Sequence, residues 1–332
     1  MPTAVIDVKT HSVITTLPVG SRSTPAFTPD GKLAYIGDTS DVSVFDVKTH
    51  SLISTAQVNR PFSLAITPDG KLAYVVDEGN DNVTVIDTKT HSIVAIVPVE
   101  QTPVNLKISP SGKLAYVVNN NLVGTVSAID IKTHSIIASI LVGQSPSSVL
   151  FTPNGKIAYV TNLNNSVTII DVTTHTVIAT LDLQDSPNRI SLTSDGKLAY
   201  VVIADGSTSV IDTKTHSVIA NVPVGTGPLN NAITPDGKLV FVTNSGNNSV
   251  SVIDTKTHSV IATIIVGQTP VNLDISPDGK LIYVVNSPDR SVSVIDVKTH
   301  SVIATIQVDF PPGFVVFTPD GKLAYVTASP PF

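Results

Sequence analysis

The sequence contains no cysteine and no long apolar run. Without cysteine, the 332-residue chain can form neither disulfides nor thiolate metal sites. Although 42% of the residues are hydrophobic, no apolar stretch approaches the roughly 18 residues of a membrane helix, so we expect no membrane insertion. No leader peptide is visible at the first residues, and no segment is a basic run, so we expect no nucleic-acid partner.

Helical patterning is also missing. No set of apolar residues at helical spacing exceeds one turn, and the apolar content is Val, Ile, Leu and Ala in short bursts between turns. The bias toward β-branched residues predicts strands that are buried on both faces. These features indicate an all-β protein.

Two short motifs recur along the chain. Asp-x-Lys-Thr-His and its close variants contain all eight histidines, at spacings of 39 to 43 residues. Pro-Asp-Gly-Lys and its close variants also occur eight times. A period of roughly 41 residues with four short strands per copy is typical of a propeller blade. The histidines are His11, His50, His91, His134, His175, His216, His258 and His300.

One copy shows the expected strands of a blade. Its innermost strand has apolar residues at alternate positions, and its later strands are rich in β-formers. Tight turns at Pro277–Gly279 and Asp296–His300 separate the first strand from the second and the third from the fourth. The four predicted strands are 272–276, 281–285, 291–295 and 302–308.

The two ends of the chain predict how the blades close. The sequence begins with the third strand of a copy and stops after a second strand, so residues 313–328 and 3–19 should share one blade. We therefore predict an eight-bladed β-propeller of four-stranded antiparallel blades, forming a single domain over residues 1–332. A seven-bladed ring would leave two strands over at each end.

Three segments resemble the signature of YVTN-repeat β-propellers. Tyr159–Asn162 and Tyr325–Thr327 match it, and Phe241–Asn244 differs by one residue. Because this family includes surface-layer proteins, the resemblance implies an extracellular or cell-surface location. Lactonases and haem d1-type proteins share the fold more distantly, and their catalytic residues match no motif here. The resemblance implies the fold and does not transfer an activity.

The loops that vary between copies form one predicted face, called the top face. Fifteen of the 16 lysines lie in the two repeated turns of the opposite face, with 14 aspartates of the same motifs. The remaining charges sum to −7, which predicts an acidic top face. This face is expected either to contact a protein, peptide or glycan partner or simply to keep the protein soluble.

Polar residues in the innermost strands form the first candidate site. Most copies have small or apolar residues there, so the exceptions predict a small-molecule pocket at the mouth of the central channel. Solvated channel lining is the alternative. The candidate ligand-binding residues are Asn105, Lys107, Arg189, Asn230, Asn272 and Asp274.

A second candidate site combines arginine and phenylalanine. Loops that enter neighbouring blades contain these residue types, which are enriched in binding hot spots. Alternatively, the phenylalanines fill gaps near the shared blade. The candidate partner-binding residues are Arg22, Arg60, Phe62, Phe310 and Phe314.

Two features of the sequence could indicate metal binding: one loop rich in carboxylates, and the eight histidines. Asp77, Glu78 and Asp81 offer carboxylates around a glycine, as calcium prefers, although a solvated turn has the same composition. The eight histidines would lie one per blade, too far apart to share a metal. We instead expect each histidine to occupy a turn position with positive φ, where replacement by Gly or Asn leaves stability intact or improves it.

The sequence favours a function without catalysis. No nucleophile–base pair or phosphate-binding loop is present. We therefore predict a monomeric, cofactor-free binding or structural module of the cell surface. Two alternatives remain open: a small-molecule or metal-dependent lactonase-like enzyme acting at the channel mouth, and a natural or engineered repeat scaffold without a ligand.

Overall fold

The structure is a computed structural model that describes residues 2–20 and 23–329. Its 32 strands form eight four-stranded antiparallel sheets, so the fold is an all-β, eight-bladed propeller. The repeat pattern of the sequence therefore predicts the fold class correctly. One short 3-10 turn, η1 at Glu78–Asn80, is the only helical element among the described residues.

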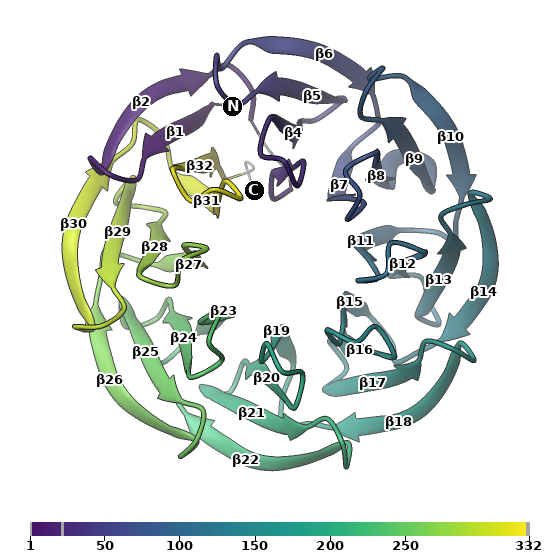
Figure 1. Ribbon diagram of the computed structural model, residues 1–332. Coiled ribbons are helices and arrows are strands. Elements are labelled where there is room, and N and C mark those ends of the chain that lie inside the picture. Colours follow the sequence, from purple (N-terminus) through teal and green to yellow (C-terminus); the bar gives the residue numbers. More distant parts are fainter. Residues whose placement is uncertain (1, 21–22, 330–332) are drawn as a thin grey trace. The chain divides into compact units, whose positions relative to one another are not determined.

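The chain divides into two compact units of four sheets each, which we describe separately (Figure 1). Unit 2 is Val19–Asp182, and unit 1 contains the residues up to Pro18 together with those from Leu183 onward. The sheets of unit 2 are β3 (Ala26–Phe27), β4 (Leu33–Gly37), β5 (Asp41–Asp46) and β6 (Leu52–Gln57); β7 (Pro61–Ile66), β8 (Leu72–Asp77), β9 (Asn82–Asp87) and β10 (Ile93–Pro98); β11 (Pro103–Ile108), β12 (Leu114–Asn119), β13 (Thr125–Asp130) and β14 (Ser135–Leu141); and β15 (Pro146–Phe151), β16 (Ile157–Asn162), β17 (Ser166–Asp171) and β18 (Thr176–Asp182).

Unit 1 repeats the same arrangement, and its last sheet combines strands from both ends of the chain. Its sheets are β19 (Pro187–Leu192), β20 (Leu198–Ile203), β21 (Ser207–Asp212) and β22 (Ser217–Pro223); β23 (Pro228–Ile233), β24 (Leu239–Asn244), β25 (Ser249–Asp254) and β26 (Ser259–Ile265); β27 (Pro270–Ile275), β28 (Leu281–Asn286), β29 (Ser291–Asp296) and β30 (Ser301–Gln307); and β31 (Pro312–Phe317), β32 (Leu323–Ala328), β1 (Thr3–Asp7) and β2 (Ser12–Leu17).

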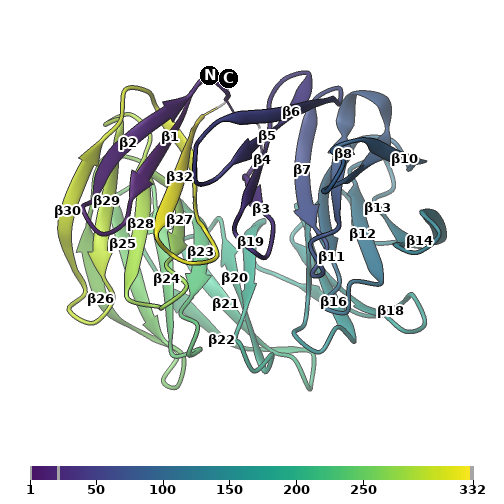
Figure 2. The same cartoon turned by 45° about the horizontal axis from the view of Figure 1, so that its top comes forward.

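The shared sheet joins the two ends of the chain by an antiparallel ladder. Strand β1 pairs with β32 from Thr3 opposite Thr327 to Asp7 opposite Leu323, and the two strands lie side by side in Figure 2. The sequence-based prediction that both termini supply strands to one blade is confirmed. Because β1 and β32 pair with each other, neither is left as an unpaired edge of the sheet.

Both repeated turns are stabilised by their own side chains. In the first, the Thr28 hydroxyl donates to Asp30 at 2.7 Å and accepts from the Leu33 N–H at 3.1 Å. In the second, Asp46 accepts from the Thr49 N–H at 2.7 Å and from the Lys48 N–H at 3.0 Å. These hydrogen bonds hold the pKa of each aspartate below its ordinary value. The repeated motifs are therefore structural.

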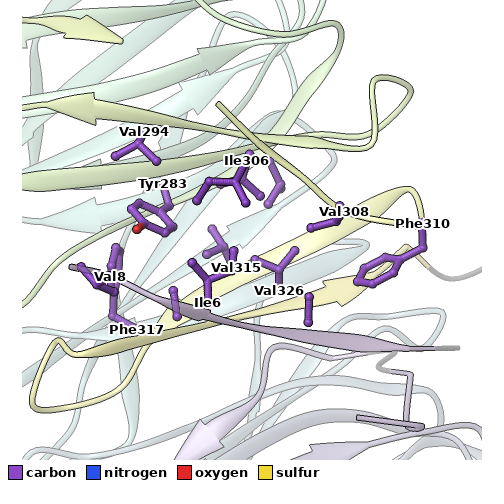
Figure 3. Close-up of a cluster of buried hydrophobic side chains, with 14 of the residues drawn as sticks. Ile6, Val8, Tyr283, Val294, Ile306, Val308, Phe310, Val315, Phe317 and Val326 are labelled. Atoms are coloured by element: carbon purple, nitrogen blue, oxygen red, sulfur yellow. The ribbon is translucent and has the colours of Figure 1, made fainter. Parts of the chain in front are cut away.

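The core lies between neighbouring sheets. Figure 3 shows one such layer in unit 1, where Tyr283 and Val294 of one sheet pack against Phe317 and Val326 of the next. The second and third strands of each sheet are almost wholly buried, as the β-branched bias predicts. The clusters repeat with each sheet, so stability depends mainly on contacts between neighbours.

The histidines do more than occupy a turn position. All eight have φ between 51° and 59°, as expected. In addition, among the contacts that the structure describes, the Nδ1 atom of five of them lies 2.8 to 3.3 Å from the hydroxyl of a buried tyrosine in the preceding blade. The pairs are His11–Tyr283, His91–Tyr35, His134–Tyr74, His175–Tyr116 and His258–Tyr200.

This contact changes the expected effect of replacing a histidine. Leaving a buried hydroxyl without its hydrogen-bond partner lowers the free energy of unfolding by about 1–3 kcal/mol. The expectation that replacing a histidine leaves stability intact, which considered only the positive φ, is therefore incomplete. His300 provides a matched control because Phe241, which has no hydroxyl, occupies the tyrosine position facing it. The His258 and His300 turns are otherwise alike, with the same hydrogen bond from the histidine N–H to the Asp254 or Asp296 carbonyl.

We therefore predict that His258→Asn lowers the free energy of unfolding by about 1–2 kcal/mol, while His300→Asn has an effect below about 0.5 kcal/mol. Asparagine tolerates the positive φ, as Asn165 and Asn248 do in other turns of this chain. Urea denaturation of both variants checks the difference. Equal effects of the two substitutions would show that the tyrosine contact contributes nothing.

Candidate functional site

The innermost strand of each sheet has one edge without a strand partner. Its outward N–H groups need other acceptors, because an unsatisfied backbone donor is costly. In unit 1, the N–H of Val315 in β31 donates to Asn272 Oδ1 of β27 at 3.2 Å. The N–H of Phe317 donates to Asp274 Oδ2 at 3.0 Å. Polar side chains of one blade thus bind the backbone of the next.

The same connection occurs in unit 2 at the same register. The third residue of an innermost strand accepts a hydrogen bond from the N–H of the fourth residue of the next innermost strand. Ser63 accepts from the Leu106 N–H at 3.1 Å, and Asn105 Oδ1 accepts from the Val149 N–H at 3.1 Å. Asn105 and Asn272 therefore have a structural role that their sequence positions did not reveal. Ser63 was missed, although aligning the third positions would have found it.

Arg189 interrupts this pattern in unit 1. It is the third residue of β19, and the fourth residue of the next innermost strand is Asn231 in β23. Asn231 pairs with Val242 in the same register as Val315 with Val326, so its N–H also faces the preceding strand. A guanidinium contains only donors. At this junction a side chain with donors only therefore occupies the position at which Ser63, Asn105 and Asn272 place an acceptor.

A cavity of about 440 Å³ lies beside this junction, between the innermost strands of unit 1. It brings together Arg189, Asn230 and Asn272 from the predicted ligand-binding set with Phe314 from the predicted partner-binding set. Apolar side chains form much of its wall, as is common in small-molecule sites. Its other lining residues are Asn188, Leu229, Thr269, Val271, Ser287, Pro288, Gly313 and Ser329.

The charge of the cavity is set by Arg189. Among the described residues that line it, none is a carboxylate or a second cation. The Arg189 side chain forms no ion pair or hydrogen bond with any residue in the described ranges. Burial lowers the pKa of the guanidinium, which nevertheless stays charged at neutral pH. Desolvation without a partner makes this cation a strong attractor for an anion.

Asp274 lies two residues beyond Asn272, toward the turn end of β27, and does not line the cavity itself. Burial raises the pKa of this carboxyl to about 6, against the opposing effect of hydrogen bonds from the N–H groups of Phe317 and Ile275. Residues two apart on a strand point to the same side. Asp274 therefore points to the same side of β27 as Asn272, which lines the cavity.

The two remaining residues of the predicted channel site lie in unit 2. Asn105 and Lys107 belong to β11, where Asn105 serves the structural contact with Val149 and Lys107 is exposed. The candidate partner residues also separate. Phe310 is only 7% exposed and belongs to the hydrophobic cluster of Figure 3, so it fills the core. Arg60 pairs with Glu78 at 3.3 Å.

Phe62 is exposed at 40%, and Arg22 lies outside the described residues. The candidate calcium loop does not fit a metal, because protein donors occupy its carboxylates. Asp77 accepts from the N–H and the side-chain amide of Asn80, and Asp81 accepts from the Thr102 N–H at 2.9 Å. Within residues 2–20 and 23–329, no three His, Asp or Glu side chains are placed to hold a metal ion.

With this geometry established, comparison with protein-family models decides the family. The model described as "Lactonase, 7-bladed beta-propeller" matches residues 24–213, more than half of the chain. The chain belongs to this lactonase family. It differs from the family description in having eight blades rather than seven. A second model, "Cytochrome D1 heme domain", matches residues 157–310. No curated protein matches the sequence.

Solved structures agree on the fold. Hydrazine synthase of Kuenenia stuttgartiensis has a TM-score of 0.69 at 23% identity, over 84% of this chain and 96% of that one. The dihydro-heme d1 dehydrogenase NirN, solved in complex with DHE, has a TM-score of 0.79 at 14% identity, over 97% of this chain and 76% of that one. At these identities, the likeness extends to the fold alone.

The family corrects the main functional prediction. A non-enzymatic binding or structural module was expected from the absence of a nucleophile–base pair, but the matched family is one of lactonases. That prediction is wrong, and the chain is an enzyme-related propeller. The physical reason is that a hydrolase using an activated water needs no side-chain nucleophile.

A haem group does not fit the cavity of this chain. Haem iron is held by His, Cys, Met or Tyr side chains, and none of these is among the described residues that line the cavity. The histidines lie in the turns between the third and fourth strands, and the sequence has no cysteine. No helix in the described part of the chain is long and apolar enough to span a membrane.

The raised pKa of Asp274 gives a prediction about stability and pH. Because folding raises this pKa from 3.8 to about 6, the native state favours the protonated carboxyl. Ionisation of Asp274 therefore lowers the free energy of unfolding as pH rises from about 3.8 to about 6. Asp274→Asn should therefore increase the free energy of unfolding above pH 7, by on the order of 2 kcal/mol, and leave it unchanged near pH 3.5. Denaturation at both values checks this; a loss of stability at pH 8 would contradict it.

Proposed function

We propose that the chain hydrolyses a small cyclic ester of the lactone type in the cavity between β19, β23, β27 and β31. The observation that supports this most strongly is the combination of a lactonase family match with a concave, largely apolar cavity containing a few polar groups. This is the lactonase-like alternative from the sequence, without the metal, because the candidate metal loop does not fit one.

The polar groups of the cavity are suited to hold a carbonyl. Asn272 uses its Oδ1 atom to accept from Val315, which fixes the amide and leaves its Nδ2 group as a donor. The Asn230 side chain, 8% exposed, forms no hydrogen bond with the described residues. Two amide donors can thus stabilise negative charge on the carbonyl oxygen as a tetrahedral intermediate forms.

Asp274 is proposed as the general base, acting through a water. With a pKa of about 6, it is mostly ionised at neutral pH and close to the range in which a base is most effective. The water oxygen attacks the carbonyl carbon while Asp274 takes a proton from the water. The ring C–O bond then breaks, and the departing alkoxide receives the proton, which yields a hydroxy acid and restores the base.

The finer predictions from the sequence remain proposals. The YVTN resemblance supports placing the chain outside the cell or at its surface. The monomeric state and the absence of nucleic-acid contacts are expectations drawn from composition and charge. If no ligand binds, the remaining alternative is the repeat scaffold, natural or engineered.

The test is a kinetic comparison of the native protein with Asp274→Asn on unsubstituted five- and six-membered lactones, measured by the acid released. We expect kcat/KM of the native protein to rise with pH around a midpoint near 6, and the variant to be slower by at least about 100-fold. The stability measurement described above shows that the variant is folded. Equal rates, or no turnover above buffer on the whole panel, would contradict the hydrolase proposal.

A further inference from the structure

The junction between β19 and β23 lacks the side-chain acceptor that three other junctions possess. Where Ser63, Asn105 or Asn272 accepts a backbone hydrogen bond, Arg189 presents only donors to the N–H of Asn231. The arrangement leaves the buried Arg189 cation in the wall of the cavity without a described side-chain partner. The neighbouring Asn231 N–H also has no acceptor among the described hydrogen bonds.

We infer that this part of the cavity is a binding site for the carboxylate of a small acid, held by the Arg189 guanidinium and the Asn231 N–H. The inference rests on the proposed small-molecule site, because it assigns the chemical class of ligand to the same cavity. A carboxylate supplies the acceptor that the junction lacks. Its planar pair of oxygens matches the fork of a guanidinium, which gives two parallel hydrogen bonds.

The rest of the cavity selects among anions. One guanidinium neutralises a single negative charge, and the described lining residues include no lysine or second arginine for a doubly charged phosphate. Leu229, Val271 and Phe314 offer an apolar wall for the body of the ligand. The expected ligand is therefore a monocarboxylic acid with an apolar or aromatic body.

This ligand class suits the proposed reaction in two ways. The acid produced by opening a lactone has a carboxylate, and a substituted lactone can have one before the ring opens. In both cases Arg189 binds and orients the ligand and takes no part in proton transfer. The binding measurement below is independent of turnover, so the two proposals can fail separately.

The chain itself suggests the variant that tests the inference. Arg189→Asn places an asparagine at this junction. Asn105 and Asn272, at the same position in their own strands, accept a hydrogen bond from the backbone of the next innermost strand. The variant is therefore expected to fold with at least native stability while losing the cation. Arg290→Asn is the matched control: it removes a positive charge from the same unit, outside the cavity, at a φ of 50° that Asn248 shows to suit asparagine.

Isothermal titration calorimetry of the full chain with benzoate, benzamide and inorganic phosphate tests the site. We expect benzoate to bind at least about tenfold more tightly than benzamide or phosphate. Benzamide has no charge to pair with the guanidinium, and the second negative charge of phosphate meets no second cation among the described lining residues. Arg189→Asn should weaken benzoate binding at least about tenfold, and Arg290→Asn should leave it unchanged.

Three results would overturn the inference: no benzoate binding, equal binding of benzamide, or full benzoate binding by a folded Arg189→Asn variant. If benzoate binds through Arg189 but no lactone is hydrolysed, the carboxylate site stands and the hydrolase proposal fails. If lactones are hydrolysed but benzoate binding does not depend on Arg189, the hydrolase proposal stands and the carboxylate site fails.

Discussion

The free edge of the innermost strands is the constraint on which this structure depends. The two middle strands of each sheet are paired on both sides, whereas the outward N–H groups of the first strand need acceptors from elsewhere. The blades meet this need by placing Ser63, Asn105, Asn272 and Asp274 against the backbone of the next blade. Of these residues, Asn272 also lines the cavity of the proposed site. In that proposal, structural and functional demands act on the same residue.

Asp274 shows the conflict between these demands most directly. It binds the backbone of β31, as an asparagine could, yet its buried carboxylate carries an electrostatic cost that an asparagine would avoid. Arg189 shows the same conflict with opposite charge, because it gives up a hydrogen bond that other junctions make. Residues that reduce stability in this way are often retained for function. Arg189 lines the cavity, and Asp274 lies two residues beyond Asn272, which also lines it; this proximity is the reason for proposing a single site.

The sequence predicted the fold well because each blade is specified by local signals. The turns depend on contacts within about five residues, such as Thr28 with Asp30 and Leu33, and the copies repeat them. The contact of His258 with Tyr200 was not predicted, because it joins residues of two different copies. For the same reason, Phe310 and Phe314 looked equivalent in the sequence, whereas one lies in the core and the other lines the cavity.

The candidate site was predicted in part. The polar exceptions in the innermost strands included Arg189, Asn230 and Asn272, but the sequence grouped them with Asn105 and Lys107, which lie in the other unit. Arg189 and Asn105 occupy the same position in their strands, and the hydrogen bond that Asn105 accepts from the next innermost strand is visible only in the structure. The lactonase family could not be inferred from a nucleophile motif, since the proposed chemistry uses a water and one carboxylate.

The most direct test of the account is residue-resolved amide hydrogen exchange with and without benzoate. The account predicts that the Val315 N–H, already bonded to Asn272, is protected in both conditions. The Asn231 N–H should exchange rapidly in the free protein and become protected when benzoate binds. Protection of Asn231 in the free protein, or no change on addition of benzoate, would contradict the claim that this junction lacks an acceptor which the ligand supplies.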